Sequence, residues 1–530
     1  MVAKHSSNIL NLFFVTIIFF IILATFSIFN QSNKHNKHTL IEATNGIPEN
    51  INPILQNHNQ SENDIVALTF NGLFKLDNEG KPVLDLAKNW EVTPDGRTYT
   101  IQIKEPIFWH DGKRLTTSDI SFTISYLRNN LISNQDTSIW NEIEVFLINS
   151  NTVIFHLKER FAPFLTYLTF PILPNHISSN NYSINDEFNP MNIVGTGPYI
   201  MQSFNNTHAH FIRNPSYHYG VPKIKNITLK FFESNEEMLN GINQELFDSS
   251  MIMLSNKISI NKLSSYKVTK YPMGQSTTLF MNNSIEPFNE LVNRKYIGQL
   301  LHNKEFFTNI QLDISTEIIP GNVIHPASWA GRGFSTTNNQ YAKKRSNHGH
   351  DHDHDHDHDH IERPALTLIV PQDVNLFSIA NNIKDELFKE DIKINIRKFS
   401  TNQDFELALE DRNFDFALLN ISELADPDPY YIWHTSQTLI PGFNISGIND
   451  LLLDGLIEQG RTIPDMYERL AIYDKFQSRF NEIIPSIIIA HPVYTYVTKK
   501  TISGPESTII YNLSHRFKNI HRWEIIINQG

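Results

Sequence analysis

Cysteine is absent from this chain of 530 residues. Disulfide bonds, thiol nucleophiles, cysteine zinc sites and a lipid-modified N-terminal cysteine are therefore excluded. Three common catalytic motifs are also missing: the His-Glu-x-x-His helix of zinc peptidases, the Gly-x-Ser-x-Gly elbow of hydrolases and the Gly-Lys-Ser/Thr phosphate loop. We therefore expect a protein that is not an enzyme, with no catalytic residues and no required cofactor.

Positive charge is in the minority, because 44 lysines and arginines stand against 56 acidic residues, giving a formal net charge of -12. Nucleic acids and anionic membrane surfaces attract basic surfaces, so we expect no nucleic-acid partner. Hydrophobic residues make up 40% of the chain, which is enough to fold most of its length. A chain this long exceeds one compact core, so we expect two or three folded units.

The N-terminus carries a long apolar run, since residues 9–29 contain no charged side chain. At about 1.5 Å per residue such a helix crosses a hydrocarbon core of ~30 Å. No small-x-small cleavage motif follows the run. We expect residues 1–38 to form an uncleaved membrane anchor and a short linker, with a cleaved signal peptide as the alternative.

Helical and strand patterns alternate beyond residue 38. Residues 98–103 alternate apolar and polar side chains after the turn at 94–97, which predicts a strand with one buried face. Residues 116–129 and 470–483 carry apolar side chains at helical spacing, and Pro485 ends the second helix. No fixed repeat period is present, so the pattern indicates a mixed α/β protein.

One segment departs from this composition, because residues 348–360 consist mainly of alternating histidine and aspartate. With almost no apolar side chains, we expect residues 343–363 to form a mobile loop. Imidazole and carboxylate groups suit zinc or nickel. The candidate metal ligands are seven histidines: His348, His350, His352, His354, His356, His358 and His360. A functionally neutral repeat expansion is the alternative, and both interpretations stay open.

Short motifs recur in a characteristic order along the chain. They include Asn52-Pro53, Phe70-Asn71-Gly72-Leu73-Phe74, Trp109-His110-Asp111-Gly112, Val194-Gly195-Thr196-Gly197-Pro198-Tyr199 and Ala425-Asp426-Pro427-Asp428-Pro429-Tyr430. Together and in this order they resemble the bacterial extracellular solute-binding proteins of family 5, which include oligopeptide-, dipeptide- and nickel-binding proteins. The resemblance runs from Thr39 to the C-terminus, apart from the His/Asp tract.

The resemblance implies an α/β fold of the two-lobed periplasmic-binding-protein type, class II, with hinge strands, here preceded by the N-terminal membrane helix. We expect residues 39–273 to form the first lobe, completed by residues 490–530. Residues 274–489 would form the second lobe. The hinge crossings are expected near Met273 and near His491.

The same resemblance implies an extracytoplasmic substrate-binding protein of an ABC-type importer, which captures short peptides by lobe closure. Its partners would be the peptide, the permease subunits of the importer and the membrane, reached through the N-terminal helix. The protein would then lie at the cell membrane with its binding domain on the extracytoplasmic side. A nickel or zinc receptor or store that uses the His/Asp tract is the alternative.

The resemblance also implies a ligand-binding residue. In peptide-binding members an acidic residue just before an acidic-Pro dipeptide pairs with the ammonium group of the peptide, and Glu423, four residues before Pro427, takes that position. The chain has Asn420 where members commonly carry an aromatic residue three positions earlier. Two acids and two aromatics complete the candidate set: Asp426, Asp428, Tyr431 and Trp433. A solvated Asp-Pro-Asp-Pro turn and core aromatics are the structural alternatives.

Overall fold

The computed structural model describes residues 38–54, 59–130, 138–177, 193–252, 264–314, 318–320, 322–331, 364–439 and 442–526. The expected N-terminal membrane helix and the His/Asp tract lie outside these ranges. Within them, no helix combines the length and the apolar character needed to cross a bilayer.

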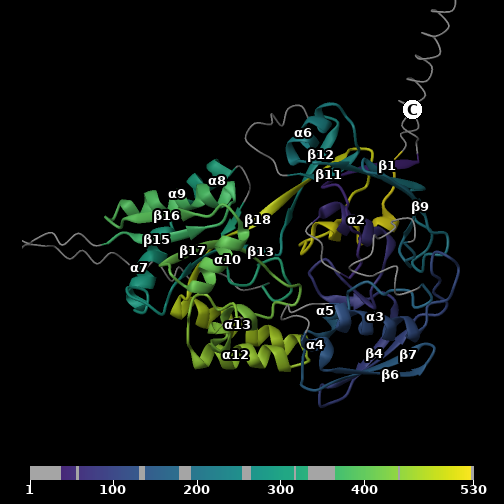
Figure 1. Ribbon diagram of the computed structural model, residues 1–530, viewed down its shortest axis with the longest axis horizontal. Coiled ribbons are helices and arrows are strands. Elements are labelled where there is room, and N and C mark those ends of the chain that lie inside the picture. Colours follow the sequence, from purple (N-terminus) through teal and green to yellow (C-terminus); the bar gives the residue numbers. More distant parts are fainter. Residues whose placement is uncertain are drawn as a thin grey trace, which may run out of the picture.

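The chain folds into two lobes that lie side by side (Figure 1). The first lobe contains the elements from β1 to β12 together with the C-terminal segment. Its elements are β1 (Thr39–Asn45), α2 (Gln60–Thr69), β2 (Phe74–Leu76), β3 (Pro82–Leu84), β4 (Ala87–Val92), β5 (Thr98–Ile103), α3 (Thr117–Asn130), α4 (Ser138–Asn141), β6 (Ile143–Asn149), β7 (Thr152–Leu157), α5 (Phe164–Tyr167), β8 (Tyr199–Phe204), β9 (His208–Arg213), β10 (Asn226–Phe232), α6 (Asn235–Asn243), β11 (Ser249–Ile252), β12 (Tyr266–Pro272), η6 (Leu513–Phe517) and η7 (Ile520–Arg522).

The second lobe contains the elements from β13 to α13, and the long strand β18 follows it. These elements are β13 (Gln275–Met281), α7 (Leu291–Leu301), α8 (Lys304–Ile314), β14 (Ile318–Pro320), β15 (Leu366–Val370), α9 (Val374–Phe388), β16 (Ile394–Lys398), α10 (Asn402–Asp411), β17 (Phe416–Ser422), α11 (Tyr430–Trp433), η5 (Thr435–Thr438), α12 (Leu451–Thr462), α13 (Met466–Ile483) and β18 (Ser486–Lys499).

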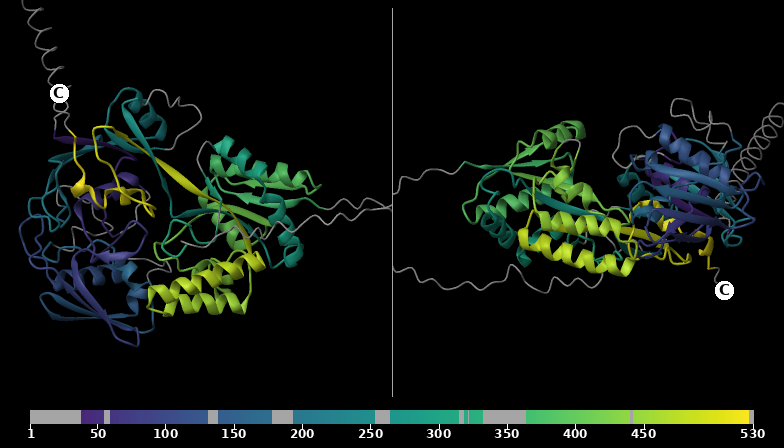
Figure 2. Two further views of the ribbon diagram at one scale, coloured as in Figure 1. Left: turned by 180° about the vertical axis from the view of Figure 1, so that it is seen from behind. Right: turned by 90° about the horizontal axis from the view of Figure 1, so that it is seen from below.

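Strand β18 belongs to both lobes. Its first half pairs with β13 and β14, and its second half, from Val493 onward, pairs with β12 and β11. A twelve-stranded sheet therefore continues from one lobe into the other, in the order β16-β15-β17-β13-β18-β11-β1-β10-β9-β8, with β12 and β14 also on β18. In Figure 2 this strand is the long yellow arrow that runs between the lobes.

The second lobe packs helices on both faces of its sheet. Successive residues of β18 point to opposite faces, as strand geometry requires. Ile487 and Ile489 join the core under α7, α8 and α9, whereas Ile488 joins the core under α10, α12 and α13. Because both faces are covered, the central strands β13 and β18 consist almost entirely of buried residues.

The first lobe adds a separate four-stranded sheet in the order β4-β5-β7-β6. The alternation predicted for residues 98–103 is confirmed, since Tyr99, Ile101 and Ile103 are buried while the residues between them are partly exposed. The helices predicted at 116–129 and 470–483 are confirmed as α3 and the greater part of α13. Periodicity was sufficient here because each element has one buried face.

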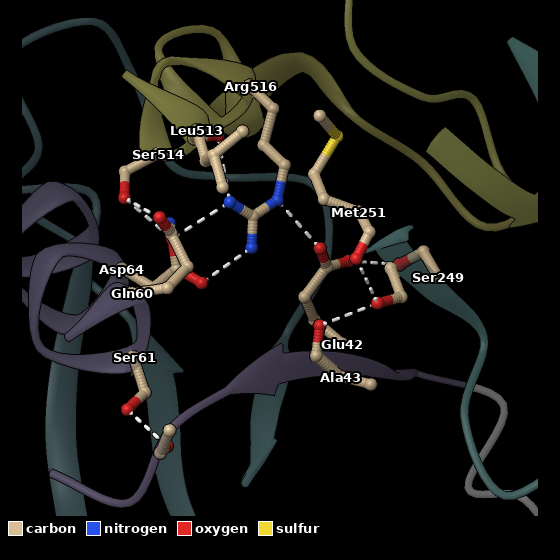
Figure 3. A network of polar contacts seen from close by, with 12 residues as sticks. Glu42, Ala43, Gln60, Ser61, Asp64, Ser249, Met251, Leu513, Ser514 and Arg516 are labelled. Atoms are coloured by element: carbon tan, nitrogen blue, oxygen red, sulfur yellow. Dashed lines mark hydrogen bonds and ion pairs between the residues drawn. The ribbon is translucent and has the colours of Figure 1, made fainter. Parts of the chain in front are cut away.

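The C-terminal segment is tied to the start of the first lobe by a buried cluster of charges (Figure 3). Arg516 donates from Nη2 to the Asp64 carboxylate at 2.6 Å and from Nε to Glu42 at 2.8 Å. All three residues are at most 2% exposed. Glu42 also accepts bonds from Ser249 and from the Tyr496 hydroxyl group. Arg516 thus joins β1 to α2, and Glu42 joins β1 to β11 and β18.

Burial raises the pKa of Glu42, although the Arg516 guanidinium opposes that shift. Two carboxylates share one buried cation, so the balance of charge in the cluster depends on Arg516.

We predict that Arg516→Met lowers the free energy of unfolding by about 3 to 5 kcal/mol, because it leaves two buried carboxylates without a cation. Urea denaturation followed by circular dichroism measures the change. The matched control is Lys223→Met, which removes an exposed ion pair to Glu524 in the same C-terminal segment, 2.9 Å long with both side chains more than half exposed. The control should change stability by at most about 1 kcal/mol. Equal losses in the two variants would contradict the prediction.

Candidate functional site

The site lies where the strands cross between the lobes. Strand β17 pairs with β13, and β13 pairs with β18. Glu423 follows directly after β17, and its N–H donates to the carbonyl oxygen of Gly274 at 2.8 Å. This backbone bond extends the β17-β13 ladder by one residue, and the Glu423 side chain reaches His491 of β18.

The Glu423 carboxylate is only partly satisfied. Its Oε2 accepts from the backbone N–H of His325 at 3.1 Å. Its Oε1 lies 3.4 Å from Nδ1 of His491, an ion-pair distance. The N–H of this ring does not point at Oε1 closely enough to form a hydrogen bond. Oε1 is therefore buried without a hydrogen-bond partner in the part of the chain that the structure describes. A buried carboxylate oxygen without a donor is costly, so this atom is the strongest indication of a ligand contact.

The C-terminal segment places Tyr511 next to this carboxylate. The Tyr511 ring packs against Gly274 and Gly80, where an added Cβ would lie 2.2 Å and 2.6 Å from ring atoms. Its hydroxyl group is buried and has no hydrogen-bond partner among the described residues. Burial raises the pKa of Tyr511, and the negative charges of Glu423 and Asp426 raise it further. The hydroxyl group therefore stays protonated and is available as a donor.

His325 lies against His491, with ring centres 4.3 Å apart. Its Nδ1 accepts from the N–H of Ala327 at 2.9 Å. Burial lowers the pKa of His325 to about 2, and the neighbouring His491 adds to this effect. His325 is therefore neutral, and its proton is on Nε2, a second buried donor without a partner among the described residues.

Asp426 is fully engaged within the second lobe. Its two oxygens accept from Nη1 and Nη2 of Arg469 at 2.7 and 2.5 Å. Arg469 also donates to the Tyr473 hydroxyl group at 2.8 Å. Asp426 and Arg469 are each 3% exposed. Each oxygen of Asp426 therefore has a buried charged donor within the second lobe, so its geometry favours a structural role.

Asp428 and Arg461 lie where the second lobe meets the first. Asp428 Oδ2 is 2.9 Å from Arg461 Nε. The guanidinium carbon of Arg461 lies 5.2 Å from the centre of the Phe161 ring. Its carbonyl oxygen, one of the last of α12, accepts from the N–H of Ala162 at 2.7 Å. These contacts join the two lobes.

A second contact between the lobes involves the β2-β3 hairpin. The N–H of Trp329 in the second lobe donates to the carbonyl oxygen of Glu79 at 3.0 Å. The turn between β2 and β3 therefore also contacts the second lobe.

The two aromatic candidates have different surroundings. Trp433 is 4% exposed and lies in the core of the second lobe, stacked on Phe280 with ring centres 5.4 Å apart. Tyr431 is 39% exposed and stacks on Phe443 at 5.9 Å. Trp433 is thus placed for packing, while Tyr431 has open surface.

The expected metal ligands, His348 to His360, fall in the part of the chain that is not described. Among the residues that are described, no group of three or more His, Asp or Glu side chains could hold a metal ion.

Three residues near Glu423 were not singled out as site residues from the sequence: His325, His491 and Tyr511. His491 was placed only as a hinge crossing. None lies in a local motif, and they meet Glu423 only through contacts between residues far apart in the chain.

Comparisons with known proteins identify the family and the fold. Residues 81–440 match the family model for bacterial extracellular solute-binding proteins, family 5 middle. The chain is 21% identical over 514 residues to the dipeptide-binding protein of Escherichia coli strain K12, covering 91% of this chain and 94% of that protein.

Two solved structures show the same fold. NikZ from Campylobacter jejuni, in complex with Ni(L-His), aligns with a TM-score of 0.69 at 20% identity, over 92% of this chain and 99% of that one. The oligopeptide-binding protein AppA from Bacillus subtilis, in complex with a nonapeptide, aligns with a TM-score of 0.67 at 19% identity, over 92% of this chain and 98% of that one. The fold is thus that of two-domain periplasmic binding proteins.

We predict that Asp428 titrates near pH 6. Burial raises its pKa to about 6 from the ordinary 3.8, which Arg461 only partly offsets. The folded protein then binds a proton more readily than the unfolded chain, so this group adds stability as the pH falls through 6. At about 1.4 kcal/mol per pKa unit, the wild type should gain about 1 to 1.5 kcal/mol relative to Asp428→Asn between pH 7 and pH 5. Chemical denaturation of both proteins at the two pH values measures this difference, and a difference that does not change with pH would refute the assignment.

Proposed function

Because the chain belongs to the bacterial extracellular solute-binding proteins of family 5, we propose that it is the substrate-binding protein of an ABC-type importer that captures short peptides between its lobes. Its partners are the peptide and the permease subunits of the importer. Binding and delivery need no chemical step, which agrees with a family of binding proteins rather than enzymes. The observation that carries the proposal is the buried, unpartnered Oε1 of Glu423 at the junction of the lobes.

An ammonium group is the ligand feature that suits this atom best. A free carboxylate oxygen needs a donor, and a donor with a positive charge contributes about 1.5 to 3 kcal/mol. The N-terminus of a peptide supplies such a group. Arg469, a buried cation of the second lobe, is already held by Asp426 and Tyr473. Glu423 is therefore free to take its counter-ion from the ligand.

Two neighbouring donors support the same reading. The Tyr511 hydroxyl group and Nε2 of His325 are both buried, and neither has a partner among the residues described. Carbonyl oxygens of a peptide backbone accept from such groups. The first residue of a peptide has an ammonium group close to a carbonyl oxygen. A carboxylate that accepts from the ammonium group, beside donors that bind the carbonyl oxygen, is the pattern expected for a site that binds this residue. Glu423 and Tyr431 remain in the proposed contact set, whereas Asp426, Asp428 and Trp433 serve the structure.

We propose residues 39–273 with 490–530 as the first lobe and residues 274–489 as the second. The change of partners along β18 supports these boundaries. The hydrogen bonds of Arg461 to Ala162 and of Trp329 to Glu79 join the lobes without strand pairing. Opening would break these contacts and leave β18 intact, which is a hinge movement.

For the parts outside the described structure, we propose an N-terminal anchor at residues 1–38 and a metal-binding tract at residues 348–360. The anchor would keep the protein at the membrane with its lobes on the extracytoplasmic side. The tract could bind zinc or nickel in addition to the peptide, or serve as a metal store. The charge-free run and the seven regularly spaced histidines favour these roles.

One mass-spectrometry experiment tests both roles. Protein purified from membranes should have the mass of the uncleaved chain, and it should gain zinc adducts that a deletion of residues 347–360 removes.

Because a loop without apolar residues contributes little buried area, the deletion should leave the melting temperature of the metal-free protein unchanged. A mature N-terminus beyond Phe29 would refute the anchor, and stoichiometric zinc on the deletion variant would place the metal elsewhere.

We predict that Glu423→Gln weakens peptide binding about 10-fold or more, equal to about 1.4 kcal/mol or more. The variant keeps the shape of the side chain and removes its charge. Native mass spectrometry after incubation with a mixture of di- to pentapeptides identifies a binding peptide, and calorimetry gives its affinity. The control Glu482→Gln removes an exposed carboxylate of the same lobe, 61% exposed, and should bind as the wild type does.

An N-acetylated copy of that peptide completes a double-mutant cycle. If the ammonium group and Glu423 meet, the acetylated peptide should bind the wild type and Glu423→Gln equally poorly. Additive losses would move the ammonium contact away from Glu423. Failure of every peptide to bind would refute the proposed function.

A further inference from the structure

His491 is fully buried where β18 passes from one lobe to the other, and both of its ring nitrogens face backbone carbonyl oxygens. Nδ1 lies 3.0 Å from the carbonyl oxygen of Gln275 on β13, and Nε2 lies 3.0 Å from that of Asn322. A carbonyl oxygen only accepts hydrogen bonds. A neutral imidazole has one proton, so it would leave one nitrogen lone pair directed at an acceptor. Only a ring with two protons satisfies both contacts.

The surroundings supply one nearby negative charge for such a ring. Glu423 Oε1 lies 3.4 Å from Nδ1. Among the described residues, His325 also contacts the ring. Its ring centre is 4.3 Å away, and burial lowers its pKa, so it stays neutral. Tyr511, beside Glu423, stays protonated and neutral, because burial raises its pKa. A proton on each ring nitrogen of His491 would therefore place a cation beside the Glu423 carboxylate.

The contact between these two groups is incomplete. A proton on Nδ1 would be directed at the Gln275 carbonyl oxygen, so the ring would give Glu423 charge compensation but no aligned hydrogen bond. A ligand ammonium group at Oε1 would supply both. The ligand ammonium group would also bring a positive charge close to a doubly protonated His491. Burial strengthens the repulsion between the two positive charges.

We propose that His491 carries protons on both ring nitrogens in the ligand-free protein, as the internal counter-ion of Glu423, and that a ligand ammonium group replaces it with release of one proton to solvent. The second half rests on the proposed function. The ammonium group keeps its protons, the imidazolium group becomes neutral imidazole, and the released proton passes to the buffer, so charge and atoms balance. Peptide binding then tightens as the pH rises, as long as the amine of the peptide stays protonated.

This arrangement makes the site prefer ligands with a positively charged end over ligands with an uncharged end. Without a cationic ligand, Glu423 keeps its internal partner. A ligand with an uncharged end offers no replacement for His491 and gains nothing from its departure. His491 is thus a specificity-determining residue that acts through Glu423.

The first test is a neutron crystal structure of the unliganded protein near neutral pH, which needs no variant. Deuterium on both Nδ1 and Nε2 of His491 is the expected result. Deuterium on one nitrogen only would overturn the proposal, whatever the protein binds.

The second test is calorimetry with trialanine near pH 6.5, in buffers of different ionisation enthalpy. At this pH a free peptide amine, with a pKa of about 7.7, is almost fully protonated and contributes few protons itself. The wild type should release about one proton per peptide, and His491→Gln about none. The control His210→Gln, at an exposed histidine of β9, should release as many protons as the wild type.

The outcomes separate the two proposals. Binding without proton release would overturn the exchange at His491 and leave peptide capture in place. If trialanine does not bind, the count is repeated with a peptide selected from the mixture of di- to pentapeptides. No binding by any peptide, together with two deuterium atoms on His491, would overturn peptide capture and its linked proton release, while supporting the internal ion pair.

Discussion

The hydrogen-bond ladder of β18 is the constraint on which the rest of the structure depends. One strand supplies partners to both lobes, so neither lobe can move as a free body. Between its two halves stands Pro492, which has no N–H to donate, while its carbonyl oxygen accepts from Met273. The strand therefore donates one hydrogen bond fewer at this point. Glu423, His491 and Tyr511 gather there because this is where elements of both lobes meet.

Buried charges are handled in three ways within the same molecule. Asp426 has a dedicated arginine with two bonds, and both partners are satisfied. Glu42 shares Arg516 with Asp64, and hydroxyl groups supply the remaining bonds. Glu423 has a backbone donor on one oxygen and no hydrogen-bond donor on the other, within the described structure. In the first two arrangements the carboxylates take their donors from the protein itself. In the third, one carboxylate oxygen can accept a hydrogen bond from a bound ligand.

Sequence reasoning reached the local features and missed the long-range ones. Periodicity was enough for β5, α3 and α13, because each has a single buried face. Motif order indicated the family, which the match over residues 81–440 confirms. The offset from Pro427 selected Glu423 as a candidate, and that role remains a prediction. The surroundings of Glu423 could not be derived, because His325 and Tyr511 reach it from distant segments. The core position of Trp433 likewise depends on Phe280, far away in the chain.

The Arg516 cluster also determines when the first lobe can be completed during synthesis. Glu42 and Asp64 leave the ribosome hundreds of residues before their cation does, and β1 lacks the β11-β18 side of its sheet until then. Contacts of such high sequence separation form late and slow the folding reaction. The early part of the chain therefore stays incompletely folded while the remainder is made.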